Sequence, residues 1–354
     1  MKSHKNIKAI SLFSGAGGLD IGATLAGVTI LSAMDFDKDS IRTLNLNKKY
    51  FDGEILESNI KDIQGSHYKK LPYNSEHEKL ILIGGPPCQP FSKAGYWVGN
   101  KNRKIDKDPR NMVTEYLRIL EEVHPDGFLL ENVASLLHPT NRHTIDIIIY
   151  KAHQLGYNTK VLKLNAIDFG VPQKRQRIFI LGSNNHKFMN DIKKTHTESI
   201  KARIEGLKPY VSVSSVISEF DDNKYHEPEE ETKTGTYAHQ LSLVPPGRNY
   251  LHLTEKRGYK NPYFKANTRF WNFLLKLDPN LPSWTIAAQP GPWVGPFHWT
   301  SRRLRVPEIA AIQTFPKDYQ FYGSRRSIQK QIGNAVPPIL AKNVIEYLIQ
   351  HIAE

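Results

Sequence analysis

The only cysteine of the 354-residue chain, Cys88, lies in the segment GGPPCQPFS (84–92), directly after the apolar run Leu80–Ile83. Pro86 and Pro87 lack a backbone N–H and have a fixed φ, so they cannot continue a regular strand or helix. The segment therefore predicts a stiff loop at the carboxyl end of a strand, where open α/β sheets place their ligand sites. From the loop alone, a reactive thiol and an inert packing group both stay open, because free cysteine is often buried.

Two further segments place charged side chains beside predicted strands. Glu131 follows the apolar run Gly127–Leu130, so its carboxylate would point into the same crevice as the cysteine loop. Arg175 and Arg177, in the run QKRQR, are two residues apart and would share one face of an extended chain. Either guanidinium could hold a phosphate, orient a carboxylate or lower the pKa of a nearby thiol. Taken singly, the glutamate also suits a surface turn, and the arginines also suit a solvated basic edge.

A glycine-rich segment, FSGAGG (13–18), joins an apolar strand-like run to a helix-like one. Glycines allow a ligand to approach the backbone closely, and a helix N-terminus offers free N–H groups. The next predicted strand ends at Asp35, which could bind ribose hydroxyls, and Phe36 could stack on a purine. The pattern is shorter than the dinucleotide fingerprint G-x-G-x-x-G. It indicates a nucleotide-like cofactor, with a structural helix cap as the alternative.

Strand-like and helix-like segments alternate from residue 1 to about 183. Strands are predicted at Ile7–Phe13, Val28–Met34, Leu80–Ile83, Gly127–Leu130, Lys160–Leu164 and Ile178–Leu181. Helices are predicted from the glycine loop to about Ala26, over Asp37–Asn47, and at about 111–123 and 143–155. Such alternation is typical of an α/β fold with a mostly parallel sheet covered by helices.

The alternation stops after Ser183. Residues 184–300 carry an acidic stretch, many prolines and glycines, and four of the five tryptophans. We expect a second, smaller, irregular β- and loop-rich domain there, with the tryptophans in its core rather than in contact with a ligand. Helical periodicity returns near 302, and Asn334–Ala353 predicts an amphipathic C-terminal helix. The predicted organisation is a catalytic and cofactor-binding domain over 1–183, a second domain over 184–300, and a segment over 301–354 that returns to the first.

The amino-acid composition indicates which kind of partner the protein binds and in which cellular compartment it works. The formal net charge of +13 favours a polyanionic partner, nucleic acid before membrane. No apolar run approaches the ~20 residues of a membrane span. The N-terminus does not have the layout of a signal peptide, and a single thiol fits a reducing cytoplasm. The chain has no Cys/His cluster of the kind that predicts a structural zinc site.

Six segments, in this order along the chain, resemble the motifs of the DNA (cytosine-5)-methyltransferase family of the bacterial modification type. They are FSGAGGLD (13–20), GGPPCQPFS (84–92), Glu131-Asn132-Val133, QKRQR (173–177), RRLRVPEIAAIQTFP (302–316) and QIGNAVPP (331–338). The resemblance covers about 1–183 and 302–350. It implies the Rossmann-like fold of S-adenosylmethionine-dependent methyltransferases, with a target-recognition domain over 184–300.

The resemblance implies that the chain transfers a methyl group from S-adenosylmethionine to carbon-5 of a cytosine flipped out of a specific duplex DNA sequence. Cys88 would add to carbon-6, Glu131 would hydrogen-bond ring nitrogen-3, and Arg175 or Arg177 would lower the pKa of the thiol. Arg177 could also orient the base. Methyl transfer of this kind requires no metal.

The resemblance also implies contact residues. For the cofactor these are Phe13, Gly15, Gly18, Asp35, Phe36, Asn59, Ile60 and Asn334. For DNA they are Gln89, Ser92, Lys93, Arg110, Arg302 and Arg303. Apart from the resemblance, a second basic group could contact phosphates: Arg302, Arg303, Arg305, Arg325 and Arg326. The family more often has Glu where this chain has Asp35, and often has Asp where it has Asn59. We therefore expect altered, not lost, cofactor affinity.

The segment after the cysteine, 93–111, has six basic and two acidic side chains. It predicts a mobile loop that closes on DNA, and a solvated surface loop is the alternative. The whole chain is expected to be a monomeric cytoplasmic enzyme that associates with the nucleoid through DNA and is functionally paired with a restriction endonuclease.

Three other functions stay open. An RNA cytosine methyltransferase of the same fold is disfavoured by the size of 184–300, which suits groove reading. A catalytically inactive DNA-binding regulator is disfavoured by the presence of Cys88, Glu131, Arg175 and Arg177. A nucleotide-dependent oxidoreductase would require a longer glycine fingerprint and leaves the cysteine loop unexplained.

Overall fold

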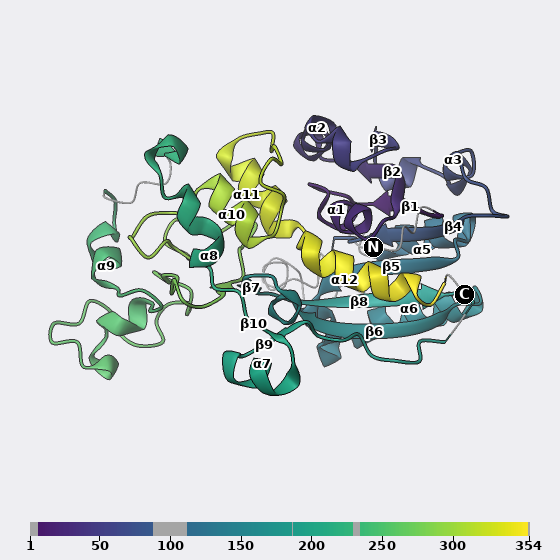
Figure 1. Ribbon diagram of the computed structural model, residues 1–354. Helices are drawn as coiled ribbons and strands as arrows, with labels where there is room; N and C mark the ends of the chain where they lie inside the picture. The colour runs from purple at the N-terminus through teal and green to yellow at the C-terminus, as the bar shows by residue number, and fades with distance from the viewer. Residues whose placement is uncertain (1–5, 88–111, 186, 229–233, 353–354) are drawn as a thin grey trace. The chain divides into compact units, whose positions relative to one another are not determined.

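The computed structural model describes residues 6–87, 112–185, 187–228 and 234–352 (Figure 1). The chain divides into two compact units. The first contains 1–165, 176–193 and 336–354, and the second contains 166–175 and 194–335. These borders differ from the expected ones at 183/184 and 300/301, because 301–335 pack with the second unit. Arg302 pairs there with Asp221, and Gln329 donates to the Ala287 carbonyl.

The first unit is built on a seven-stranded sheet of order β3-β2-β1-β4-β5-β8-β6. Five strands run parallel: β1 (Ile7–Leu12), β2 (Thr29–Asp35), β3 (Glu54–Glu57), β4 (Lys79–Gly84) and β5 (Gly127–Val133). The last two, β8 (Gln176–Ser183) and β6 (Asn158–Asn165), join it antiparallel. The mostly parallel sheet is thus confirmed. The four-residue strand β3 was not predicted.

Helices cover both faces of this sheet (Figure 1). Helix α1 (Gly18–Leu25) packs against α12 (Pro338–Ile349), which also contacts β5 and β8. Helices α5 (Val113–Val123) and α6 (Arg142–Gln154) pack into a core formed by alternate residues of the strands. On the strands this core includes Ile10, Leu12, Leu80, Leu82, Phe128, Leu130, Ile178 and Ile180.

One helix prediction is confirmed, and another is wrong at its start. Helix α2 (Lys38–Leu46) forms as expected and is capped by Asp37, whose side chain accepts the Ser40 N–H. The predicted helix Asn334–Ala353 is wrong at its start: Asn334 ends α11 (Arg325–Asn334), and α12 begins only at Pro338. Pro337 and Pro338 explain the break, since proline fits the first turn of a helix but not its interior.

The second unit is loop-rich, as expected, but its strands are much shorter than a β-rich domain would have. In the described residues they are two residues long: β7 (Gln173–Lys174) with β11 (Ser283–Trp284), and β9 (His196–Thr197) with β10 (Lys208–Pro209). The helices are α7 (Ser199–Glu205), α8 (Ser214–Ile217), α9 (Ala238–Leu243), α10 (Val306–Ile312) and α11.

Aromatic side chains form the core of part of this unit. Tyr250, Phe273 and Phe297 are buried together, and Trp293 packs against them. In contrast, Trp271 and Trp284 are exposed and contact each other edge to face, with ring centroids 4.4 Å apart. The expectation that the tryptophans build the core therefore holds for Trp293 and is wrong for this exposed pair.

Candidate active site

Four parallel strands of the first unit end in one row. Leu12 is in register with Met34 on β2 and with Gly84 on β4, and Gly84 is in register with Leu130 on β5. The residues that come next along the strands are, in spatial order, Asp35, Phe13, Gly85 and Glu131. The strand order reverses between β1 and β4, which is the switch point where open α/β sheets bind ligands. The glycine loop and the segment leading to the cysteine therefore start side by side.

The glycine loop leaves an open backbone at the head of α1. Phe13, Gly15 and Gly17 have positive φ values of 56°, 53° and 78°. The turn is held by the Ser14 N–H, which donates to the Met34 carbonyl at 2.9 Å. Apart from Gly15 and its chain neighbours, no atom of the described residues lies within 4 Å of the place where a Cβ on Gly15 would be. A positive φ is unusual for a residue as bulky as Phe13, so the loop has a constrained shape with space above it.

Asp35 supports this loop from the next strand. Its Oδ2 accepts the Gly15 N–H at 2.7 Å, and its Oδ1 accepts the Asp37 N–H at 2.9 Å. Burial raises the pKa of Asp35, while these N–H donors lower it. The adjacent Phe36 is 67% exposed. A carboxylate with further acceptor capacity beside an open aromatic ring fits a ligand with hydroxyls and a flat heterocycle.

A buried acid near the loop was not singled out from the sequence. Asp20, in the first turn of α1, is fully buried, and its Oδ1 accepts the Ser14 hydroxyl at 3.3 Å. Its Oδ2 has no hydrogen-bond partner among the described residues. The pKa of Asp20 is raised to about 6, mainly by burial and in smaller part by the nearby charge of Asp35. A charged residue inside the apolar run GLDIGATL was the available signal.

The other residues predicted to contact the cofactor differ in whether they are exposed to solvent. Asn59 is exposed, and its side chain accepts the Lys61 N–H at 3.1 Å. The Ile60 side chain is 3% exposed and belongs to the core, so it presents no side-chain surface to a ligand. Gly18 is the buried first residue of α1. Asn334 is an exposed residue at the end of α11, in the second unit.

Glu131 and Arg177 form an ion pair at the edge of the sheet. The Arg177 Nε lies 2.9 Å from the Glu131 Oε1, and the two side chains are 13% and 11% exposed. Strand pairing explains the contact, because Val133 lies opposite Arg177 and Glu131 lies opposite Phe179. Burial lowers the pKa of Arg177, and the charge of Glu131 opposes this shift. The two side chains therefore contact each other with little water around them.

The segment before the cysteine is tied to the same strand. A Cβ on Gly85 would lie 3.0 Å from the Glu131 Oε2, so only glycine leaves the carboxylate undisturbed there. The Asn132 side-chain amide donates to the Pro86 carbonyl at 3.4 Å. Cys88 itself lies outside the described residues, as do Gln89, Ser92, Lys93, Arg110 and the whole segment 93–111.

Arg175 does not share the position of Arg177. It is fully buried and donates to the carbonyls of Ile286, Gly333 and Ala335 at 3.2, 2.6 and 3.1 Å. The extended run breaks between β7 and β8 at this residue, so the expected common face of the two arginines is not formed. The contacts of Arg175 connect segments of the second unit.

The two arginines expected to bind DNA have different environments. Arg302 is 9% exposed and donates to both carboxylate oxygens of Glu308 at 2.8 and 2.7 Å and to Asp221 at 2.7 Å. A phosphate would have to break these pairs to reach its guanidinium. Arg303 is half-buried and donates to the Pro292 carbonyl at 2.6 Å.

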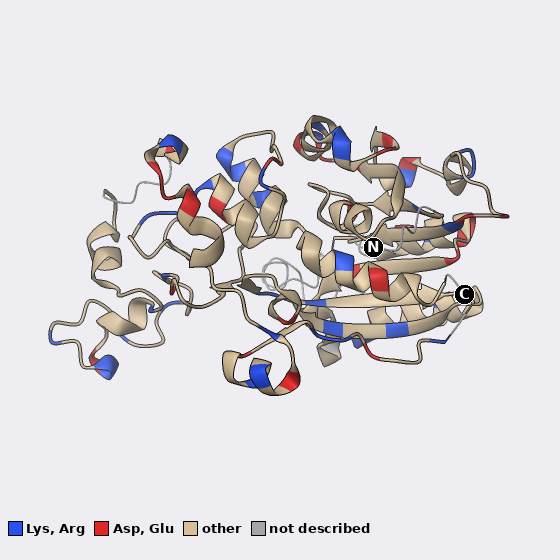
Figure 2. Ribbon diagram, in the orientation of Figure 1, with Lys and Arg blue, Asp and Glu red and all other residues tan. Residues whose placement is uncertain are grey.

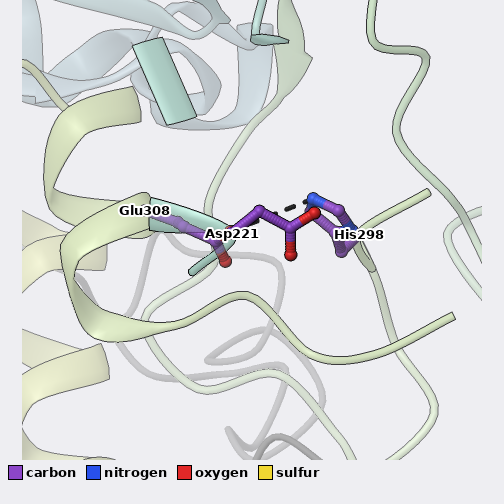
Figure 3. Close-up of side chains that lie close together, drawn as sticks. All are labelled: Asp221, His298 and Glu308. Atoms are coloured by element: carbon purple, nitrogen blue, oxygen red, sulfur yellow. Dashed lines mark ion pairs between the residues drawn. The ribbon is translucent and has the colours of Figure 1, made fainter. Parts of the chain in front are cut away.

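Asp221, His298 and Glu308 place possible metal ligands within 4.8 Å of one another (Figure 3). The guanidinium of Arg302 already supplies the positive charge between the two carboxylates. The Nδ1 of His298 accepts the Thr300 N–H at 3.2 Å, which leaves the proton of the neutral ring on Nε2. Burial and the neighbouring arginines hold the pKa of His298 down at about 3. These residues fit an arginine-centred buried network better than a metal site.

Known proteins share sequence with this chain over most of its length. The family model for C-5 cytosine-specific DNA methylases matches residues 7–350. The type II methyltransferase M.SacI of Streptomyces achromogenes is 37% identical, over 98% of this chain and 93% of the relative. M.FnuDI of Fusobacterium nucleatum is 32% identical, over 97% and 95%.

The fold has solved counterparts as well. A crystal structure described as a DNA modification methyltransferase encoded within an E. coli prophage aligns with a TM-score of 0.64 at 22% identity, over 98% of this chain and all of that one. None of the helices in the described part of the chain is both long and apolar enough to span a bilayer. The chain belongs to the C-5 cytosine-specific DNA methylase family.

Proposed function

We propose that this enzyme transfers the methyl group of S-adenosylmethionine to carbon-5 of a cytosine flipped out of a specific duplex DNA sequence. The observation that carries the proposal is the Glu131–Arg177 pair, which lies against the segment that leads into Cys88. Family membership supports the reaction class, and the sheet edge supports a common site. Flipping is required because the ring of a stacked cytosine is out of reach of these side chains.

Cys88 is the nucleophile in this proposal. Its thiolate forms a bond to carbon-6 of the base, and the electron pair of the 5,6-double bond moves toward carbon-5, which becomes nucleophilic. After methylation, a base removes the carbon-5 proton, the 5,6-double bond re-forms, and the thiolate leaves. The positive charge of Arg177 favours a thiolate in this region.

Glu131 stabilises the ring while the thiolate is attached. Addition at carbon-6 places negative charge on the ring, and a hydrogen bond between ring nitrogen-3 and the carboxyl group is strongest at that stage. Arg177 fixes the orientation of the carboxyl group through Nε, and its Nη1 donates to the Gln176 carbonyl at 2.8 Å. The remaining nitrogen, Nη2, is available to orient the base.

The residues around the glycine loop fit S-adenosylmethionine, which when bound supplies an electrophilic methyl group. The exposed ring of Phe36 would stack on the adenine, and Asn59 offers an exposed amide to its edge. The remaining acceptor capacity of Asp35 would take the ribose hydroxyls. The open backbone at Gly15 admits the amino-acid portion.

We further assign sequence recognition to the second unit and place the enzyme in a restriction–modification system. The first assignment rests on the sheet-edge residues lying in the first unit. The second rests on relatives that are type II methyltransferases.

The proposal is tested by replacing the nucleophile. Cys88→Ala should abolish methyl transfer to DNA, measured with tritiated S-adenosylmethionine, because no other side chain can form the bond to carbon-6. Duplex DNA carrying 5-fluorocytosine should trap wild-type protein as a covalent adduct on Cys88, seen by mass spectrometry. Turnover of the variant near the wild-type rate would disprove the covalent mechanism. Methyl transfer to tRNA but not to duplex DNA would instead favour an RNA methyltransferase.

A further inference from the structure

The second unit contains a cavity of about 720 Å³ with a basic wall. We call it the arginine pocket, and it is lined by Arg303, Arg325, Arg326, Gln329 and the segment Ile286–Pro292, together with a few neighbouring residues. Arg325 and Arg326 are the first two residues of α11, and the ribbon of basic residues is blue in Figure 2. All of these residues belong to the same compact unit.

The described residues neutralise the positive charge of the arginine pocket only in part. Arg325 pairs with Glu227 at 3.0 Å. Arg303 donates to the Pro292 carbonyl, but no carboxylate lies within ion-pair distance of it in the described part of the chain. Arg326 is exposed and has neither a hydrogen bond nor an ion pair to any described residue. In the part of the chain that the structure describes, one of the three guanidinium groups, that of Arg325, thus has a carboxylate partner.

Such an arrangement favours an anion. Burial and the nearby charge of Arg325 both lower the pKa of Arg303. The positive charges of these two arginines therefore repel each other in the protein without a ligand. The N-terminus of α11 adds partial positive charge at the same place. A planar guanidinium fork matches the oxygens of a phosphate, and pairing with phosphate would relieve the repulsion.

We propose that the arginine pocket binds a backbone phosphate of the DNA substrate, with Arg303 and Arg326 as the donors and Arg325 held in place by Glu227. This inference rests on the proposed function, because that function supplies DNA as the polyanion. The pocket is larger than one phosphate group, so the adjoining sugar also fits. The contact positions the duplex and carries no sequence information of its own.

The test compares Arg326→Ala with Arg203→Ala. Arg203 is a matched control because it is an exposed arginine of the same unit, on α7, with no ion pair to a described residue, and it does not line the pocket. Binding of a fluorescent duplex of random sequence is measured by anisotropy across a salt series. Arg326→Ala should lower the slope of log K against log salt by about 0.9, the amount for one phosphate contact. Arg203→Ala should leave the wild-type slope.

Several outcomes would overturn the inference. These are an unchanged slope for Arg326→Ala, or an equal fall for Arg203→Ala. In a second experiment, ATP is titrated into the wild-type protein and into Arg326→Ala. If Arg326→Ala loses ATP binding but keeps the wild-type salt slope for DNA, the pocket binds a free nucleotide instead. Methyl transfer by the wild-type enzyme is measured in parallel. If it methylates DNA and Arg326→Ala keeps the slope, only the pocket assignment fails; if it methylates no DNA, the proposed function fails.

Discussion

In the proposed mechanism, Glu131 stabilises negative charge on the cytosine ring, and this charge exists only while the base is covalently attached to the enzyme. Glu131→Gln should therefore reduce the rate of methyl transfer by roughly 10²-fold or more, with a much smaller change in DNA affinity. Glutamine keeps the size of the side chain but cannot share a proton with ring nitrogen-3. Single-turnover methylation and DNA anisotropy, measured on the same protein, separate the two effects. A loss that lay wholly in DNA affinity would make Glu131 a docking residue.

Asp20 gives the protein a specific pH dependence of stability. Its pKa rises from 3.8 to about 6 in the folded protein, with burial as the main cause. Between these values the unfolded chain releases a proton that the folded chain keeps. Stability contributed by this group is therefore complete below pH 3.8 and is lost as the pH rises to about 6. The loss is at most ~3 kcal/mol.

Asp20→Asn should remove this dependence. The free energy of unfolding of the variant, relative to wild type, should rise between about pH 4 and pH 6 and then stay constant. Urea unfolding of both proteins over this range and up to pH 8 provides the measurement. A difference between the two proteins that does not change with pH would show that the carboxyl group is ionised in the folded state throughout.

At the scale of elements, the start of α10 depends on one buried network. Glu308 is fully buried, accepts the Arg305 N–H at 2.7 Å and pairs with Arg302. Arg302→Ala should destabilise the protein by ~3–5 kcal/mol, because it leaves a buried carboxylate without its counter-charge. Arg303→Ala is the matched comparison, since that side chain donates to a carbonyl, and its loss should be ~1 kcal/mol.

The double variant Arg302→Ala/Glu308→Gln sharpens this prediction. Removing the buried charge together with its partner should restore part of the lost stability, so the two changes should not add. Chemical unfolding of the four proteins in the cycle gives the coupling free energy. Additive losses would mean that the arginine and the glutamate do not depend on each other. Those Arg302→Ala molecules that are folded should bind DNA with the wild-type salt slope. The reason is that the guanidinium of Arg302 contacts carboxylates in the wild-type protein and not DNA.

The sheet of the first unit could be predicted from the sequence because its central strands are buried on both faces and so appear as continuous apolar runs. Strand β3 escaped prediction for the opposite reason: it is a four-residue edge strand, EILE, with no fully buried side chain. The two-residue strands of the second unit carry no periodicity at all. Their position depends on tertiary contacts such as the Ser283 N–H, which donates to the Pro172 carbonyl.

For the candidate site, the residues at the strand ends could be predicted from the sequence, but the side chains and carbonyls that pair with the site's arginines could not. Glu131 and Asp35 lie where the rule for parallel strands places them. The sequence did not reveal that two nearby arginines have different environments, because a one-residue break between β7 and β8 lies at Arg175. It also did not reveal that Arg302 is saturated by carboxylates, one of which, Asp221, is 81 residues away in the chain. Such pairings depend on how distant segments pack.

At the scale of the whole molecule, the borders of the two compact units indicate where the proposed recognition segment can be exchanged with that of a relative. A cut at 300/301 separates several side chains of the second unit from their partners. Arg302 pairs with Asp221, Arg325 with Glu227, and Gln329 with the Ala287 carbonyl, and each contact crosses that border. A cut at 335/336 keeps them all together. Arg175, which stays behind, donates to backbone carbonyls that any replacement segment also has.

We therefore expect two chimeras with a family member that methylates another sequence to differ. Exchange of 194–335 should give a folded enzyme whose methylated site, read by bisulfite sequencing of host DNA, is that of the donor. Exchange of 184–300 alone should give a less stable protein, by thermal unfolding, because the partly buried Arg302 and Arg325 lose their carboxylate partners Asp221 and Glu227. Choice of sequence follows base contacts, and these are assigned to the exchanged unit. A folded, active 194–335 chimera that still methylates the original site would place sequence recognition in the first unit.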